Sequence, residues 1–162
     1  MSAPTIRLAR SDEAGAAQAL ARAAYQHYVA RMGREPAPML ADYGTLIAAG
    51  EVHLLESGGR LRGLIVLRSD GDALFVENVA VERAAQGQGL GRALMAFAEA
   101  EARRRGAARI ELYTNVLMTE NLAFYPRLGF REIGRWEEDG YHRVYFEKPL
   151  ARGPDTDKAG DC

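Results

Sequence analysis

The feature that most constrains this chain is a glycine-rich stretch between an apolar segment and an amphipathic one. Residues 73–81 predict a strand, and residues 90–105 predict a helix. The stretch between them includes Gln86, Gly87, Gln88, Gly89, Leu90, Gly91, Arg92 and Ala93. The first turn of a helix leaves backbone N–H groups without partners, its dipole adds partial positive charge, and glycine lets an anion approach closely. The stretch therefore predicts a site for a phosphate-bearing ligand.

Glycine spacing narrows the class of ligand. A P-loop needs Lys-Ser or Lys-Thr after its last glycine, and here Arg92 and Ala93 follow Gly91. A dinucleotide fingerprint needs G-x-G-x-x-G and an acid about 20 residues further on. The chain has G-x-G-x-G, with Glu111 at about that distance but inside an apolar strand. The P-loop is excluded, and a dinucleotide site and a tight turn without ligand stay open as alternatives.

Composition and charge predict one small soluble domain. The chain has 162 residues, 48% of them hydrophobic and 27% charged, with a net charge of −1. This charge favours neither a nucleic-acid nor a membrane partner. The lone Cys162 rules out an internal disulfide and a cysteine-ligated metal cluster, and no metal site is predicted. Residues 1–5 carry no secretory pattern, and no apolar run spans a bilayer, so cytoplasm is the expected location.

Apolar periodicity and turn residues predict one α/β domain over residues 1–150. Strands are predicted at residues 5–9, 52–56, 61–68, 73–81, 109–114, 130–135 and 141–146. Helices are predicted at residues 11–32, 39–49, 90–105 and 119–128. Residues 151–162 have no apolar periodicity and predict a flexible tail.

Two motifs in this order resemble the GNAT acyltransferases. Gln86-x-x-Gly89-x-Gly91 resembles the pyrophosphate loop Q/R-x-x-G-x-G/A of that family, and residues 125–130 resemble its Y-x-x-x-G-F segment. The resemblance runs from about residue 5 to about residue 150, with its motifs between residues 73 and 130. It implies a mixed, mostly antiparallel sheet of about seven strands, flanked by four helices and splayed between the fourth and fifth strands.

The resemblance also implies a function and a cofactor. The chain is expected to transfer an acetyl group from acetyl-CoA directly to a primary amine, on a small molecule or on a peptide or protein. The residues expected to bind the cofactor are Val79, Ala80, Val81, Gln86, Gly87, Gln88, Gly89, Leu90, Gly91, Arg92 and Ala93. A non-catalytic acyl-CoA-binding or regulatory module of the same fold is the alternative, and a nucleotide-binding protein is a third class.

Tyr125 is the candidate acid that protonates the departing thiolate. The ordinary pKa of tyrosine, about 10, lies closer to that of a thiol than the pKa of any carboxylate does. Enzymes of the resembling family often use the tyrosine at this position in that way. A tyrosine that only packs on the sheet is the alternative.

Glu77 is the candidate base. Strand alternation places it on one face with Val79 and Val81, and a carboxylate within an apolar strand is costly unless it is paired or functional. An ion pair with a neighbouring arginine is the alternative role. A bulge, common here in the resembling family, would turn Glu77 to the other face, and His53 and His142 are other candidate bases.

The remaining candidates are less constrained by the sequence. Met118 stands where many GNAT members carry an asparagine, so Asn121, one helical turn before Tyr125, is the candidate replacement contact to the cofactor. The resemblance places the acceptor near Tyr25, Tyr28, Met32, Met39, Tyr43, Trp136 and Tyr141. Of these, Tyr28, Met39, Tyr43 and Tyr141 are expected to bind substrate, although ordinary core packing or a homodimer face would also use such residues.

Overall fold

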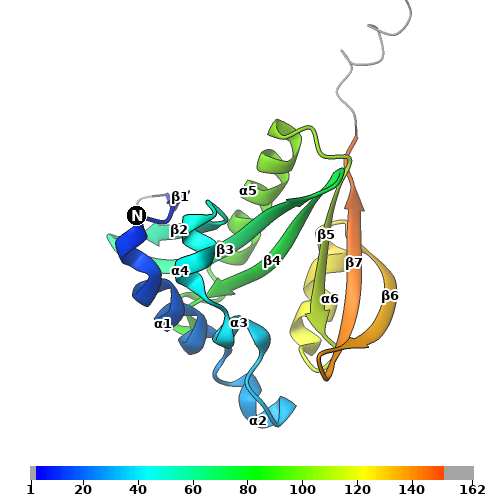
Figure 1. Ribbon diagram of the computed structural model, residues 1–162, viewed down its shortest axis with the longest axis horizontal. Coiled ribbons are helices and arrows are strands. Elements are labelled where there is room, and N and C mark those ends of the chain that lie inside the picture. Colours follow the sequence, from blue (N-terminus) through cyan, green and yellow to red (C-terminus); the bar gives the residue numbers. More distant parts are fainter. Residues whose placement is uncertain (1–2, 152–162) are drawn as a thin grey trace, which may run out of the picture.

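A seven-stranded sheet with the order β1-β2-β3-β4-β5-β7-β6 organises the molecule (Figure 1). The computed structural model describes residues 3–151. The predicted tail, residues 151–162, therefore lies outside the described residues except for Ala151. Neighbouring strands are antiparallel except β4 and β5, which are parallel, and this confirms the mixed, mostly antiparallel sheet. The strands are β1 (Thr5–Leu8), β2 (Val52–Ser57), β3 (Arg60–Asp70), β4 (Ala73–Val81), β5 (Arg109–Asn115), β6 (Arg131–Glu138) and β7 (Tyr141–Pro149).

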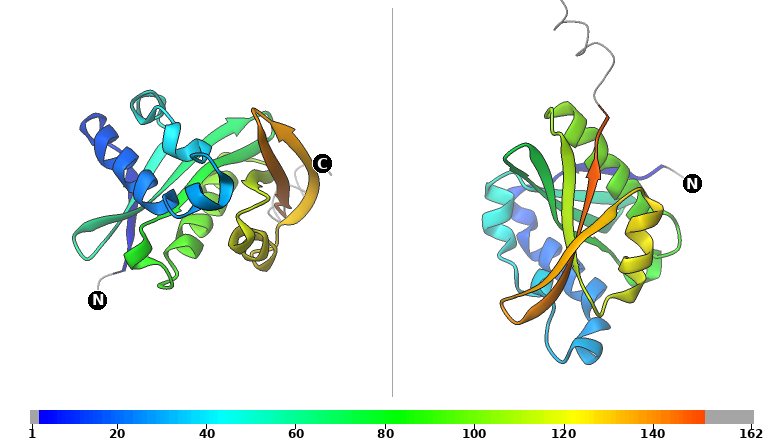
Figure 2. Two further views of the ribbon diagram at one scale, coloured as in Figure 1. Left: turned by 90° about the horizontal axis from the view of Figure 1, so that it is seen from below. Right: turned by 90° about the vertical axis from the view of Figure 1, so that its right-hand side faces the viewer.

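Helices cover both faces of the sheet (Figure 2). One face carries α1 (Ala14–Tyr25), α2 (Tyr28–Met32), α3 (Ala37–Leu40) and α4 (Tyr43–Ala48). The other face carries α5 (Leu90–Arg104) and α6 (Thr119–Arg127). Each face has its own buried apolar cluster, centred on Leu94 and Phe146 beneath α5 and α6, and on Met39 and Leu54 beneath the other helices. None of the helices within the described residues has the length and apolarity of a membrane span.

The prediction of four helices has to be corrected, because two of them are each divided in two. The predicted helix 11–32 begins with a 3₁₀ turn at Ser11–Glu13 and breaks between α1 and α2, where no glycine or proline marks the break. The predicted helix 39–49 breaks at Ala41, whose backbone is extended. Asp42 then caps α4 by accepting the Thr45 N–H at 3.2 Å. A capping side chain starts a new helix, so periodicity alone could not place this boundary.

The sheet opens where the parallel strands β4 and β5 part. They pair only from Ala73 and Arg109 to Val76 and Leu112 and then diverge (Figure 1), which confirms the predicted splay. On the other side of β4, Val66 of β3 pairs with Asn78 whereas Leu67 pairs with Val76. Glu77 is therefore the extra residue of a β-bulge, and the bulge lies at the point where the sheet opens.

Candidate active site

The larger of two adjoining cavities is a groove of about 900 Å³ beside the open edge of β4. We call it the outer groove. Its volume is typical of a site for a small-molecule ligand. The lining residues are Ala24, Tyr25, His27, Tyr28, Arg31, Val79, Ala80, Val81, Arg83, Gln86, Gly87, Gly89, Leu90, Gly91, Arg92, Glu120, Asn121, Phe124, Tyr125 and Arg127.

A row of unpartnered backbone N–H groups faces this groove at the start of α5. Within the described chain, the N–H groups of residues 87–92 have no hydrogen-bond partner. The next N–H, that of Ala93, donates to the Gly89 carbonyl oxygen at 3.0 Å. Unpaired donors together with the positive end of the helix dipole favour an anion at this place.

Glycine sets the path of this stretch without being required by packing. Gly87 and Gly89 have φ angles of 85° and 78°, which glycine adopts far more readily than other residues. A Cβ atom built at either position would meet no other atom within 4 Å. The glycines therefore turn the chain and leave the space above the N–H groups open.

Positive side chains surround the outer groove. Arg31 pairs with Glu120 at 2.7 Å. The Tyr28 hydroxyl also donates to Glu120, and these contacts lower the pKa of that carboxyl group to about 2. The other arginines of the lining have no ion-pair partner within residues 3–151, and they are Arg83, Arg92 and Arg127. This excess of positive charge suits a ligand with several phosphates.

The edge of β4 offers further free backbone groups. Glu82 donates its N–H to β3 at 2.8 Å. By alternation, the backbone groups of Val79 and Val81 therefore point away from β3 toward the open edge. Gln86 Nε2 donates to the Val81 carbonyl oxygen at 3.2 Å and so folds the glycine-rich stretch back onto the strand. An extended chain with amide groups could pair with what remains of this edge.

A buried chain of hydrogen bonds runs from Tyr25, in the wall of the outer groove, to the helices that pack against β4. The Tyr25 hydroxyl lies 2.7 Å from Asn78 Oδ1 and 2.6 Å from the Val79 carbonyl oxygen, and donates to one of them at a time. Asn78 Nδ2 donates to the Tyr43 hydroxyl at 2.8 Å, and that hydroxyl donates to the Pro38 carbonyl oxygen at 2.6 Å. These bonds fix β4 relative to the helices on its face.

The second cavity, which we call the inner cavity, measures about 50 Å³ and lies where β4 and β5 diverge. Tyr25, Val79, Asn121 and Tyr125 line both cavities, so the two meet at these residues. The other residues of the inner cavity are Met32, Pro36, Ala37, Pro38, Val76, Glu77, Asn78, Tyr113, Thr114, Asn115, Met118, Tyr141 and Arg143.

Glu77 faces the inner cavity. The prediction from alternation that it shares a face of the strand with Val79 and Val81 is wrong. Because Glu77 is the bulged residue, it lies near Arg68 and Tyr113, whereas Val79 and Val81 pack on the opposite face, under α5. Its Oε2 atom lies 3.2 Å from Arg68 Nη2, yet it is buried and makes no aligned hydrogen bond. Burial raises the pKa of Glu77, and the charge of Arg68 offsets part of that rise.

Tyr125 lies where the two cavities meet. Its ring packs edge-on against Phe124 and Phe130, with centroids 5.2 and 5.8 Å away. Within the described residues its hydroxyl has no hydrogen-bond partner. Burial raises the pKa of Tyr125, so the hydroxyl keeps its proton at neutral pH and remains free to donate it.

Asn121 also lies at this junction, but part of its hydrogen-bonding capacity is used. Its Nδ2 atom donates to Thr114 Oγ1 at 3.0 Å and lies 3.7 Å from the sulfur of Met118. Met118 is buried, in the position where an asparagine was expected. Within the described chain, the side-chain oxygen of Asn121, Oδ1, is the part of the amide group that remains free for a ligand.

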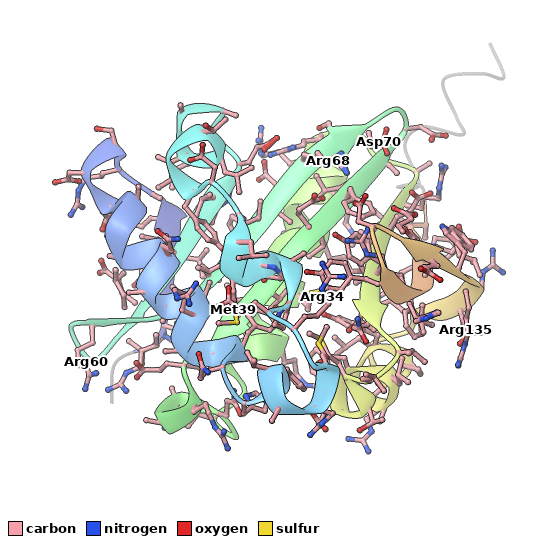
Figure 3. All side chains as sticks on the ribbon, turned by 60° about the horizontal axis from the view of Figure 1, so that its bottom comes forward. Arg34, Met39, Arg60, Arg68, Asp70 and Arg135 are labelled. Atoms are coloured by element: carbon pink, nitrogen blue, oxygen red, sulfur yellow. The ribbon has the colours of Figure 1, made fainter. Side chains whose placement is uncertain are left out.

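The predicted substrate residues separate into two groups. Tyr25, Met32 and Tyr141 line the inner cavity, and Tyr28 lines the outer groove. Met39 lies fully buried between α3 and the sheet (Figure 3), and Tyr43 is buried beside Asn78. Trp136 is exposed on the outer hairpin, where it stacks on Tyr145.

The two histidines proposed as alternative bases line neither cavity. His53 is buried and its ring contacts that of Phe97, with the centroids 4.8 Å apart. His142 is exposed beside Glu137. Within residues 3–151, no group of three His, Cys, Asp or Glu side chains is arranged to hold a metal ion.

A loop and a hairpin that are far apart in sequence close the outer side of the inner cavity. Arg34 reaches toward the β6–β7 hairpin (Figure 3), where its Nη1 donates to the Asp139 carbonyl oxygen at 3.2 Å. Its guanidinium lies 3.9 Å from the centre of the Tyr141 ring. The Tyr141 hydroxyl in turn donates to the Glu35 carbonyl oxygen at 2.7 Å. These contacts hold Tyr141 in the cavity wall.

Asn78, Tyr113 and Arg143 are among the residues of the inner cavity that were not predicted from the sequence. Asn78 and Arg143 are buried polar residues within strands. A polar residue inside an otherwise apolar strand is a signal that could have drawn attention to both. Tyr113 gives no such signal, because tyrosine is common in half-buried strands.

Two comparisons concern the sequence. The acetyltransferase (GNAT) family model matches residues 17–130. YvbK of Bacillus subtilis (strain 168), described as an uncharacterized N-acetyltransferase, is 30% identical over 105 residues, which are 64% of this chain and 67% of YvbK.

Solved structures share the fold. The PaiA N-acetyltransferase from Thermoplasma acidophilum, in complex with coenzyme A, superposes with a TM-score of 0.79 at 15% identity, covering 92% of this chain and all of that one. The ribosomal-protein-S18-alanine N-acetyltransferase from Escherichia coli superposes with a TM-score of 0.73 at 21% identity, covering 94% and 97% of the two chains.

Proposed function

The chain belongs to the GNAT acetyltransferase family, and from this premise we propose that it transfers an acetyl group from acetyl-CoA to a primary amine. The observation that carries the proposal is the meeting of the two cavities at Tyr125. The outer groove offers backbone donors to an anion, and the inner cavity holds a carboxylate with a raised pKa. This arrangement supports an enzyme more than a module that only binds acyl-CoA.

The outer groove fits coenzyme A part by part. The pyrophosphate would accept hydrogen bonds from the N–H groups of residues 87–92, and the arginines around the groove would add positive charge. The pantetheine amides would pair with the open edge of β4, where the carbonyl oxygens of Val79 and Val81 already have side-chain partners but, within the described residues, the N–H groups do not. The thioester would then lie beside Tyr125, at the entrance to the inner cavity.

The residues of the inner cavity account for the proton transfers of a direct reaction. Glu77 accepts a proton from the ammonium group, directly or through a water molecule, and its raised pKa makes it a better base. The amine nitrogen attacks the thioester carbonyl carbon and forms the new C–N bond. The C–S bond then breaks, Tyr125 gives its proton to the departing thiolate, and the second proton of the amine nitrogen returns to Tyr125 through water as the amide forms.

Calorimetric titration of the purified protein with acetyl-CoA, with NAD and ATP as comparison ligands, tests the cofactor. We expect binding in the micromolar range for acetyl-CoA and none for NAD or ATP. Release of free CoA is then measured over a panel of amines. Binding without CoA release from any amine would support the non-catalytic module, and binding of NAD in place of acetyl-CoA would contradict the proposal.

A further inference from the structure

The inner cavity holds a positive charge that acetyl transfer itself does not require. The side chain of Arg143, on β7, lines this cavity and is only 9% exposed. Removing a guanidinium group from water costs several kcal/mol unless charged or polar partners replace the water. The partners of Arg143 therefore indicate what else the cavity is built to hold.

Those partners leave much of the guanidinium unused. Arg143 Nη1 donates to Glu138 Oε2 at 3.0 Å, and the group lies near the Tyr145 hydroxyl. Glu138 is shared, because it also accepts from Trp136 Nε1 and from Tyr145. A guanidinium has five N–H donors, so Glu138 and Tyr145 account for at most two of them.

Aromatic rings hold this guanidinium in place. It lies 4.2 Å from the centre of the Tyr113 ring and 5.5 Å from that of the Tyr141 ring. Both rings line the inner cavity. Stacking of this kind fixes the plane of the group without using its N–H donors. The remaining donors are thus oriented but have no acceptor within the described residues.

The same cavity also carries the complementary charge. Glu77 extends from β4, and its buried Oε2 atom lacks an aligned hydrogen bond although Arg68 neutralises part of its charge. The carboxylate and the guanidinium thus come from the two sides of the splay, β4 and β7. Each has hydrogen-bonding capacity that the protein itself leaves unused.

We infer that the acceptor is a small amine that also carries a carboxylate, such as a free amino acid. Its amino group lies beside Glu77, and its carboxylate accepts hydrogen bonds from the free donors of Arg143. The inference rests on the proposed acetyltransferase function. A planar guanidinium matches a carboxylate with two parallel hydrogen bonds. A peptide N-terminus would place a neutral amide there and leave the guanidinium without an anion.

The first experiment needs no variant. The twenty amino acids are compared with their carboxamides and their decarboxylated amines as acceptors, at saturating acetyl-CoA, by release of free CoA. For the best side chain we expect kcat/KM to be about ten- to hundredfold higher for the amino acid than for its amide, because hydrogen bonds between charged groups are the strong ones. Equal kcat/KM for the two would overturn the inference while leaving the acetyltransferase function intact.

The second experiment assigns the preference to one residue. Arg143→Gln is expected to remove the preference for the acid over the amide while keeping activity on the amide, and Arg143→Lys to keep part of the preference. Arg135→Gln is the matched control, because Arg135 lies exposed on β6 in a surface ion pair (Figure 3) and should leave the preference unchanged. Retention of the full preference in Arg143→Gln would overturn the role of Arg143.

Two further outcomes complete the test. If Arg143→Gln does not fold, as judged by circular dichroism and thermal unfolding, Arg143→Lys decides the assignment in its place. A reduced preference in Arg143→Lys for acid over amide would then support recognition of the carboxylate by Arg143, and an undiminished preference would contradict it. If no amine of the panel is acetylated although acetyl-CoA binds, the inference fails together with the proposed function.

Discussion

The outer groove and the inner cavity are built in different ways. The anion-binding part of the outer groove consists of backbone N–H groups from one continuous segment, residues 87–92. The inner cavity is lined by residues of α1, α2, α3, β4, β5, α6 and β7 and of the loops before α3 and α6. Backbone groups recognise what every acyl-CoA has in common, whereas side chains can differ from one acceptor to another. This difference predicts that the groove is sensitive to added bulk and the cavity to the loss of single polar atoms.

Substitution Gly89→Glu should have the largest effect. The new side chain places bulk and negative charge in the open space above the N–H groups, and acetyl-CoA affinity should fall at least about a hundredfold through repulsion of the pyrophosphate. Calorimetry measures the loss. Gly106→Glu is the matched control, because Gly106 has a similar φ of 74° and equally open space but lies at the far end of α5. Retained affinity in Gly89→Glu would remove the pyrophosphate from this site.

Substitution Tyr125→Phe should change turnover and not cofactor binding. Removing the hydroxyl removes the proposed acid, so kcat should fall by about tenfold or more while the Kd for acetyl-CoA changes little. Steady-state assays measure kcat, and calorimetry measures the Kd. An unchanged kcat would show that Tyr125 only packs against the neighbouring phenylalanine rings.

Substitution Arg68→Gln should shift a pH profile. A base must be ionised, so kcat/KM should rise with pH through the pKa of Glu77, which burial raises and Arg68 lowers. Removing Arg68 should therefore move this rise to higher pH, with less than about a tenfold loss near neutral pH. In Glu77→Gln the rise should vanish. A profile that keeps its acid limb in Glu77→Gln would assign the limb to another group.

The smallest effect concerns stability. The folded-state pKa of Glu77 is raised above its unfolded value, so its stabilising effect is complete only below the unfolded pKa and is lost as pH rises through the folded pKa. Glu77→Gln, which stays neutral, should therefore raise Tm by about 1–3 °C at pH 7.5 and give no gain near pH 4. Thermal unfolding at the two pH values measures this. A lower Tm at pH 7.5 would mean that the ion pair with Arg68 outweighs the cost of burial.

The outer groove could be predicted from the sequence more fully than the inner cavity. The glycine-rich stretch could be predicted because a strand, three glycines and a helix are local signals, and the splay followed from the family resemblance. The boundary at Asp42 could not be placed by periodicity, because a capping side chain decides it. Arg143 could not be assigned to the cavity, since only strand pairing between β5 and β7 brings it opposite Asn115. The facing of Glu77 depended on a bulge that alternation does not predict.

The bulge at Glu77 changes the alternation of β4, and no substitution of one residue for another could do the same. Before Glu77 the strand keeps one alternation of its faces, and after Glu77 it keeps the other, so the two halves are out of phase by one residue. Because Glu77 is the extra residue, removing it alone would leave Leu67 opposite Val76 and Val66 opposite Asn78, and the edge at Val79 and Val81 would keep its facing. Inserting or removing one residue elsewhere in β4 would instead exchange the faces of everything beyond it. Such changes should be far less tolerated than in the turns between strands, where chain length is free to vary.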